Sequence, residues 1–292
     1  MKSSAKNIVL KSVDDIFQTE ENRADAQRER VQEIPLDQLK PFRNHPFKVR
    51  DDQRMLDTVD SIREYGVLVP AIARPDPEGG YELISGHRRK RGCEMAGLQT
   101  MPVIIRNLDD DAAVLVMVDS NIQREELLPS ERAFAYKMKL EALKHQGARS
   151  DLTSRQVVGK LEMADVVGQN AGESGRQVQR YIRLTELISE LLDMVDERKL
   201  AFNPAVEVSY LKRDEQRMLL EAMDAEQTTP SLSQAQRLKK FSQEGRLTEE
   251  AMSAIMSEEK KSDMDKVTLR SDTLRRYFPK SYTPKQMEQT II

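Results

Sequence analysis

The stretch Ser-Gly-His-Arg-Arg-Lys-Arg at residues 85–91 decides how this sequence is interpreted. It follows a short apolar alternation at residues 81–84, which indicates a strand, and it opens a predicted helix that ends at Gly97. A glycine at a helix start, with exposed backbone N–H groups and several guanidinium groups beside it, suits a phosphate physically. The alternative is a solvated basic helix face, because short basic runs are common.

The composition narrows the class of protein. Of the 292 residues, 38% are hydrophobic, 33% are charged and 5% are aromatic, which favours helices with solvated faces in about two domains. The formal net charge of −3 means that any contact with DNA must come from local basic patches. Cys93 is the single cysteine and the three histidines are scattered, so neither a disulfide framework nor a zinc site is predicted. No apolar run approaches the ~18 residues of a membrane helix, and we expect a soluble cytoplasmic protein.

The first half of the sequence predicts a compact α+β unit after a polar tail. Residues 1–32 are expected to form a flexible tail with one short inducible helix after Ser12. The pattern beyond it predicts, in order, a helix at 52–65, a hairpin of strands at 67–73 and 81–84, the basic helix, a strand at 103–105 and a helix at 110–118. We assign this domain to residues 33–126.

The second half predicts helices throughout. A long helix is expected from Pro129 to Gln146, with Gly147 as its stop, and residues 149–222 contain several short helical patterns and no convincing strand. The predicted organisation is an all-helical domain at 127–223, followed by a helical C-terminal region and tail at 224–292.

A helix-turn-helix is predicted at about residues 162–184. On its second helix, arginines recur at spacings of four and three, so one face is cationic and the opposite face is apolar. Amide side chains can pair with adenine edges, and arginines with guanine or phosphate. The candidate DNA-binding residues are Ser174, Arg176, Gln177, Gln179, Arg180 and Arg183. The alternative is an ordinary amphipathic surface helix.

Three motifs in order and spacing resemble those of the ParB family of partition proteins, over roughly residues 33–215. The first is SIREYGVLVP at 61–70, where a helix ends at glycine and passes into a strand. The second is GHRRKR at 86–91, similar to the family's GERR box. The third is NIQREELLP at 121–129, similar to the family's ENxQRxxLxPxE box before a long helix.

The resemblance implies an N-terminal ParB/sulfiredoxin-like α+β domain, an all-α helix-turn-helix domain and a site for CTP and Mg²⁺. Gly66 and Val67 would line the base end of that site. The other implied nucleotide-binding residues are Ser85, Gly86, His87, Arg88, Arg89, Asn121 and Arg124. It further implies a homodimer that closes as a clamp on a palindromic, centromere-like site in double-stranded DNA, with a ParA-type ATPase as a possible partner and a nucleoid-associated location.

Two departures from the family pattern bear on catalysis. His87 and Ser120 stand where the family usually has glutamate, and a hydroxyl is a poor ligand for a hard cation compared with a carboxylate. Ser120 and Asn121 are the weak candidates for metal binding. We therefore expect CTP to be bound with little hydrolysis, and we name no catalytic residue.

Two other functions remain open from the sequence. The same architecture could serve a transcriptional regulator on a plasmid or integrative element, without a role in segregation. A sulfiredoxin-like or kinase-like enzyme is the third possibility, since the N-terminal fold is similar. The redox version is disfavoured because Gly86, and not a cysteine, precedes His87, while Cys93 lies well inside the predicted helix.

Overall fold

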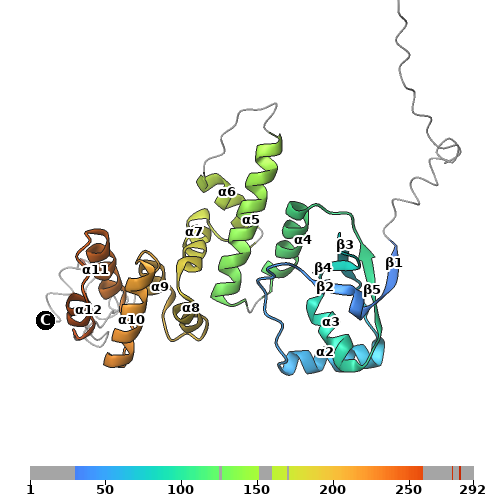
Figure 1. Cartoon of the computed structure of the whole chain (residues 1–292), viewed down its shortest axis with the longest axis horizontal. Helices are drawn as coiled ribbons and strands as arrows, with labels where there is room; N and C mark the ends of the chain where they lie inside the picture. The colour runs from blue at the N-terminus through green and yellow to red at the C-terminus, as the bar shows by residue number, and fades with distance from the viewer. Residues whose placement is uncertain are drawn as a thin grey trace, which may run out of the picture.

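The computed structural model describes residues 30–124, 127–150, 160–169, 171–258, 278 and 283. The short helix predicted after Ser12, nearly all of the expected tail and most of the region beyond residue 258 lie outside these ranges. Figure 1 shows the sheet at one end of the molecule, the C-terminal helices at the other, and α4 and α5 between them. None of the described helices is long and apolar enough to cross a membrane.

The first part of the described chain is an α+β domain, as predicted. Its elements are β1 (Val31–Pro35), η2 (Leu36–Gln38), β2 (Leu39–Pro41), α2 (Gln53–Tyr65), β3 (Ala71–Pro75), β4 (Tyr81–Ser85), α3 (His87–Ala96), β5 (Thr100–Ile105) and α4 (Asp110–Ile122). The five-stranded sheet has the order β1-β5-β3-β4-β2. The β1–β5 and β3–β4 pairs are antiparallel, whereas β2–β4 and β3–β5 are parallel, so the sheet is mixed.

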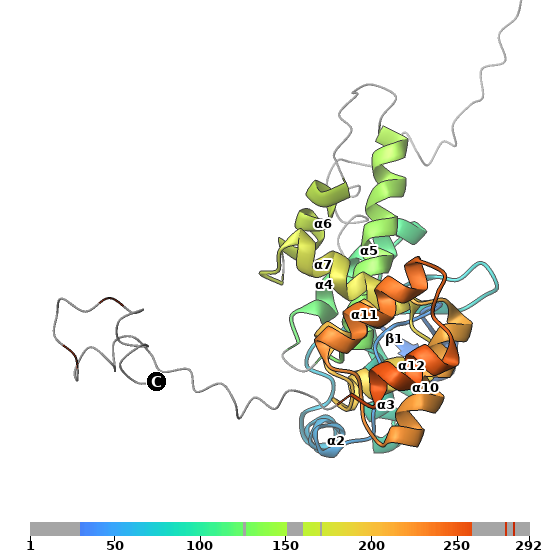
Figure 2. The same ribbon diagram turned by 90° about the vertical axis from the view of Figure 1, so that its left-hand side faces the viewer.

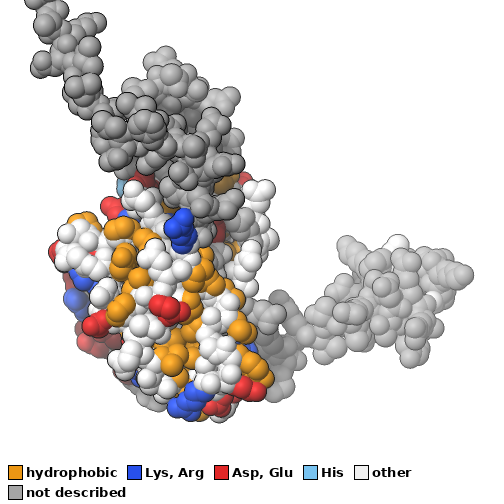
Figure 3. All heavy atoms as spheres, turned by 90° about the vertical axis from the view of Figure 1, so that its right-hand side faces the viewer, with side chains coloured by type: hydrophobic (Ala, Val, Ile, Leu, Met, Phe, Trp, Pro, Cys, Tyr) orange, Lys and Arg blue, Asp and Glu red, His pale blue; other side chains and the backbone are white. Residues whose placement is uncertain are grey.

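Helices cover both faces of this sheet. Ile62 of α2 and Cys93 of α3 pack with Leu83 and Val103 on one face. Met117 of α4 packs with Ile84 on the other face. Figure 3 views the domain from the side of β1, where hydrophobic side chains lie among polar and charged ones.

The predicted hairpin is confirmed, with a shifted first strand. Asp76 and Gly80 close its turn, because the Asp76 N–H donates to the Gly80 carbonyl at 3.0 Å. The first strand begins at Ala71 and not at Val67. The predicted helices at 52–65 and 110–118 are present as α2 and the longer α4. The strands β1 and β2 were not predicted, and β1 begins within the segment expected to be tail.

The rest of the described chain is helical. Its elements are α5 (Pro129–Ser150), α6 (Lys160–Gln169), α7 (Gly175–Arg183), η3 (Leu184–Glu186), α8 (Ser189–Asp196), α9 (Phe202–Val208), α10 (Arg213–Glu226), α11 (Leu232–Gln243) and α12 (Glu249–Met256). Figure 2 views the molecule from its C-terminal end, with α10, α11 and α12 in front. The buried Tyr136 of α5 shares one core with Val118 of α4 and Val178 of α7, which joins the helices to the sheet domain.

The prediction that Gly147 ends the long helix is wrong. α5 continues through Gly147 to Ser150. A glycine inside a helix costs only about 1 kcal/mol relative to alanine, which the neighbouring turns of a long helix can offset. Glycine ends a helix only where the chain also adopts the left-handed cap conformation.

The predicted helix-turn-helix is present as α6 and α7, and it depends on a close crossing at Gly168. A Cβ atom at Gly168 would lie 2.3 Å from the Glu173 carbonyl oxygen and 2.9 Å from a methyl of Val178. Asp165 on α6 accepts the Gly175 N–H at 2.5 Å, and Ser174 caps α7. The angle between the two helices is therefore set by a backbone contact.

Replacing Gly168 with alanine should reveal this contact. We expect G168A to lower the free energy of unfolding by about 3 kcal/mol, because the blocking atom is backbone and cannot rotate away. The matched control is G245A, where the glycine has a φ of +68° and nothing within 4 Å. That change should cost only the left-handed strain of about 1 kcal/mol. Urea unfolding followed by circular dichroism measures both, and equal losses would contradict the proposed crossing.

Candidate functional site

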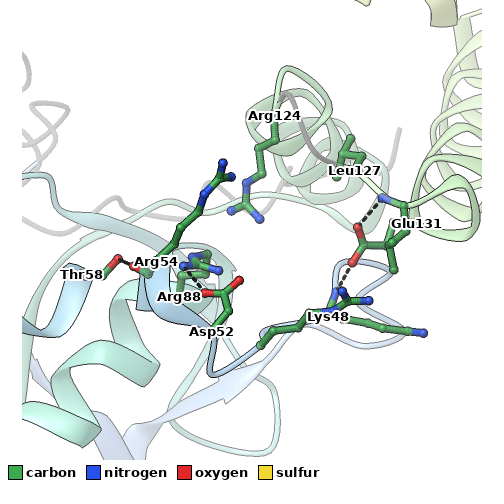
Figure 4. Close-up of a pocket in the computed structure, with 10 residues that line it drawn as sticks. Lys48, Asp52, Arg54, Thr58, Arg88, Arg124, Leu127 and Glu131 are labelled. Carbon is green, nitrogen blue, oxygen red and sulfur yellow. Dashed lines mark hydrogen bonds and ion pairs between the residues drawn. The ribbon is translucent and has the colours of Figure 1, made fainter. Parts of the chain in front are cut away.

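A cavity of about 410 Å³ opens where the first turns of α2, α3 and α5 approach one another. Cationic side chains dominate its walls (Figure 4). The lining residues are Lys48, Arg50, Asp52, Arg54, Thr58, Arg88, Arg124, Leu127, Leu128 and Glu131. The cavity thus joins the segment before α2, the basic run at 86–91 and the segment that follows α4.

The cations in this cavity lie close enough to repel one another. Figure 4 shows Arg54, Arg88 and Arg124 directed toward a common space. Burial lowers the pKa of Arg124, and the positive charges of Arg88 and Arg89 lower it further. An anion bound between these guanidinium groups would relieve the repulsion and accept charge-assisted hydrogen bonds. The arrangement therefore suits a polyphosphate.

Among the residues that the structure describes, two carboxylates line the cavity, and both are bound to protein groups. Asp52 caps α2 by accepting the Met55 N–H at 2.9 Å, and Arg88 lies 3.4 Å from the same oxygen. The Met55 N–H is the main cause that keeps the pKa of Asp52 below its usual range. Glu131 accepts the backbone N–H groups of Lys48 at 2.8 Å and Leu128 at 3.1 Å. Both carboxylates therefore organise the walls of the cavity.

A second depression of about 350 Å³ adjoins the first, since Thr58 lines both. Its lining includes the predicted residues Gly66 and Val67, together with Leu68 and Val69. The predicted residue Arg89 lies here and not in the cationic cavity. Its guanidinium donates to the carbonyls of Val69 and, at 2.7 Å, Pro70, so it supports the loop before β3. An apolar depression beside a cationic one offers separate places for a base and its phosphates.

The predicted residues Ser85 and Gly86 form the turn between β4 and α3, next to the cavity. Ser85 ends β4 opposite Ile72 of β3. Gly86 has a φ of +110°, and a Cβ atom there would lie 2.8 Å from the Ala71 side chain. Only glycine fits this turn without a shift of β3. Neither residue lines the cavity, and their effect is to direct α3 and Arg88 toward it.

His87 faces the protein interior. Its Nε2 accepts the Phe42 N–H at 3.4 Å, and its ring centre lies 3.7 Å from that of His45. Burial is the main cause that lowers the pKa of His87 to about 3 and that of His45 to about 4. The charges of Arg124 and Lys90 act in the same direction on His87. The stacked pair therefore holds the loop that leads to Lys48 while both rings are neutral.

The structure does not bring Ser120 and Asn121 to the cavity. The Ser120 hydroxyl donates to the Met117 carbonyl at 2.9 Å. The amide of the buried Asn121 donates to the same carbonyl at 2.7 Å. Among the residues that the structure describes, no three histidine, cysteine, aspartate or glutamate side chains are grouped as metal ligands. Hard divalent cations prefer oxygen ligands such as carboxylates, so Ser120 and Asn121 do not by themselves form a Mg²⁺ site.

Four of the six predicted DNA-binding residues line a basic groove of about 500 Å³ between α5, α7 and Tyr210, whereas Ser174 and Gln177 do not. Arg176 and Gln179 are exposed on α7. Lys144 on α5, which the sequence analysis did not single out, lies in the same groove. The lining residues are Leu140, Lys144, Arg176, Gln179, Arg180, Ile182, Arg183 and Tyr210.

The other predicted residues of α7 are held by protein contacts. The Ser174 hydroxyl accepts the Gln177 N–H at 3.3 Å. Arg180 donates to Asn203 at 2.5 Å and to the Gln177 side chain at 3.4 Å. Arg183 donates to the Ser209 carbonyl at 2.5 Å, and its guanidinium lies 4.1 Å from the Tyr210 ring centre. These contacts hold α7 against α9 and leave Arg176 and Gln179 exposed.

Sequence reasoning missed several residues of the cationic cavity. Lys48, Arg50 and Arg54 surround the start of α2, and Glu131 lies in the first turn of α5. The sequence did contain one indication of these residues. Cations near a helix N-terminus are unfavourable because they oppose the helix dipole, so their presence there suggests another role. Two cations before α2 and one in its first turn therefore favour a role in binding an anion.

The chain is similar to proteins of one family. The model of the ParB N-terminal domain matches residues 20–122. Stage 0 sporulation protein J of Bacillus subtilis (strain 168) is 31% identical over 180 residues, which are 62% of this chain and 57% of that protein. The probable chromosome-partitioning protein ParB of Pseudomonas putida is 32% identical over 173 residues, or 59% of this chain and 55% of that protein. The chain therefore spans less than two thirds of the length of either relative.

One solved structure is that of the C-terminally truncated chromosome-partitioning protein ParB from Caulobacter crescentus complexed with CTP-gamma-S. It is 28% identical to this chain and covers 62% of it and 92% of its own length, with a TM-score of 0.31.

The half-buried pair of His45 and His87 should make stability depend on pH. The folded-state pKa of His87 is lowered from 6.5 to about 3, so its contribution is fully present above about pH 6.5 and is lost as the pH falls toward 3. We expect the free energy of unfolding to fall by up to about 1 kcal/mol per pH unit in that window. H87Q keeps an acceptor for the Phe42 N–H but does not titrate, so the slope should decrease.

Urea unfolding at about pH 7.5 and about pH 5 measures this slope. H145Q is the matched control, because it removes a histidine whose side chain is 67% exposed. An unchanged slope in H87Q would show that the pair is not a source of the pH dependence.

Proposed function

We propose that the protein is a site-specific DNA-binding partition protein of the ParB type. The proposal starts from the finding that residues 20–122 of this chain belong to the ParB N-terminal domain family. In this proposal it binds CTP and acts as a clamp on a centromere-like site. The observation that carries the nucleotide part is the cationic cavity beside an apolar depression. Residues of all three sequence motifs surround these two spaces.

Each part of CTP has a matching environment in the proposed site. Arg54, Arg88 and Arg124 would neutralise the triphosphate, with Lys48 on the opposite wall (Figure 4). The backbone and apolar side chains of residues 66–69 would contact the base end. Arg89 would act through the loop it supports, since its guanidinium is bound to carbonyls of that loop.

We propose binding of CTP without efficient hydrolysis. The carboxylates of Asp52 and Glu131 accept backbone N–H groups, and neither is placed as an uncommitted general base. The Ser120 hydroxyl donates to a carbonyl of its own helix. Mg²⁺ takes no part in this proposal, because Ser120 and Asn121 donate to a carbonyl of their own helix and do not line the cavity.

A chain of contacts supports a link between the nucleotide site and the helical domain. Ser130 donates its N–H and its hydroxyl to Asp196 of α8 at 2.9 and 2.5 Å. Lys48, a wall of the cavity, has its Nζ 3.8 Å from the same carboxylate. Its backbone N–H is bound by Glu131, the next residue after Ser130. A triphosphate that attracts Lys48 would therefore alter the contacts of α8.

The helix-turn-helix would read double-stranded DNA through the exposed face of α7. A palindromic site has two equivalent halves, and each half requires its own helix-turn-helix. We therefore propose a homodimer that associates with the nucleoid. A ParA-type ATPase is the proposed protein partner for segregation of a chromosome, plasmid or mobile element. The second copy of the chain and the ATPase are proposed from the family, and no surface described above is assigned to either of them.

The nucleotide site can be tested by calorimetry with CTP, ATP, GTP and UTP. We expect a preference for CTP, and a loss of affinity of about tenfold to a hundredfold in R124A, because a charge-assisted contact contributes ~1.5–3 kcal/mol. R63A is the matched control, since Arg63 is a 58% exposed cation at the other end of α2. Equal affinities in R124A and R63A would refute the assignment of the cavity.

The DNA interface can be tested with fragments from the gene's own neighbourhood. R176A should weaken binding to the preferred fragment by about 1–3 kcal/mol while the fold remains intact, because Arg176 is exposed. R183A should instead lower the free energy of unfolding by about 1–2 kcal/mol, because it loses the contacts to Ser209. Fluorescence anisotropy and urea unfolding separate these effects. If R176A binds all fragments as the unaltered protein does, α7 is not the recognition helix.

A further inference from the structure

We infer that the cationic cavity holds its nucleoside triphosphate through the protein's own cations, without a divalent metal ion between protein and phosphates. The inference rests on the proposed function, since it concerns the same site. It differs from the Mg²⁺ dependence that family resemblance implies. It follows from the excess of cationic side chains in the cavity and from the protein contacts of its carboxylates.

The balance of charge in the cavity favours a metal-free polyanion. Within the described ranges, the cavity is lined by five cationic side chains and two carboxylates. The cations are Lys48, Arg50, Arg54, Arg88 and Arg124. In the described part of the chain, Arg50 and Arg124 make no ion pair. A free triphosphate would use this excess of positive charge, and guanidinium groups can bind its oxygens in pairs. A metal ion on the phosphates would reduce the negative charge that these side chains attract.

The carboxylates of the cavity are poorly placed to hold a metal ion. Asp52 is committed to the Met55 N–H at 2.9 Å and lies 3.4 Å from Arg88. Glu131 uses one oxygen for the Lys48 N–H and the other for the Leu128 N–H. The two stand on opposite sides of the space in Figure 4. A metal ion would compete with two backbone donors for the oxygens of Glu131. It would meet Asp52 mainly through Oδ2, because Oδ1 accepts the Met55 N–H and lies beside the guanidinium of Arg88.

The motif position that would supply a metal ligand is also committed elsewhere. Ser120 and Asn121 both donate to the Met117 carbonyl. Asp119, the carboxylate beside them, lies 2.5 Å from the ammonium group of Lys139, whose side chain is only 5% exposed. Lys139 therefore holds that carboxylate away from a role in metal binding.

The test compares CTP binding by calorimetry in buffer with excess Mg²⁺ and in buffer with EDTA at equal ionic strength. We expect the dissociation constant in EDTA to be equal to that with Mg²⁺ or lower by up to about tenfold. CTP that binds with Mg²⁺ but more than about tenfold more weakly in EDTA would overturn this inference and leave the proposed nucleotide site standing. CTP that binds in neither buffer would overturn the proposed nucleotide site, and this inference with it.

A variant sharpens the comparison. R124Q removes one of the cations that would do the work of a metal, so its loss of affinity should be at least as large in EDTA as with Mg²⁺. A loss seen only with Mg²⁺ would contradict the inference. R63Q is the matched control for removal of an exposed cation from the same domain. Electron paramagnetic resonance with Mn²⁺ alone should show no metal ion in the cavity of the nucleotide-free protein. A bound Mn²⁺ whose affinity changes in R124Q would lie beside Arg124 and would also contradict the inference.

Discussion

The close approach of Gly86 to Ala71 is the constraint on which the site depends. A side chain at Gly86 would lie 2.8 Å from the Ala71 Cβ, and the backbone there has a φ of +110°. This contact lets β4 turn directly into α3 while β3 stays paired beside it. The first turn of α3 then points at the start of α2, where Asp52 meets Arg88. The cavity forms where α2 and α3 begin side by side and the first turn of α5 approaches them.

The cations of the basic run have separate roles, although they are adjacent in sequence. Arg88 lines the cavity, whereas Arg89 donates to the carbonyls of Val69 and Pro70. Lys90 donates to the Leu39 carbonyl at 2.7 Å, and Arg91 pairs with Asp51 at 2.7 Å. Successive positions on a helix point in directions about 100° apart, so a run of like charges is distributed around its axis. The charge of the cavity is instead assembled from distant segments.

The same principle applies to α7. Its arginines form one cationic stripe in sequence, yet Arg183 is bound to Ser209 and Tyr210, and Arg180 to Asn203. Arg176 is the exposed arginine of this stripe, and Gln179 is also exposed on α7. Contacts with α9 thus divide the stripe into residues that hold the helix and residues that are presented to a ligand.

Local patterns in the sequence determined the helices, the hairpin and the order of the motifs, because periodicity and glycine caps act over a few residues. They missed β1 and β2, since short strands with few buried positions carry little pattern and depend on pairing with β5 and β4. Among the candidate site residues, Arg88 and Arg124 line the cavity, while Ser120 and Asn121 turn to their own helix. Lys48, Arg50 and Arg54 joined them only in the folded chain. The tertiary structure decided these roles because a side chain's charge has an effect only through the groups that folding places within a few ångströms of it.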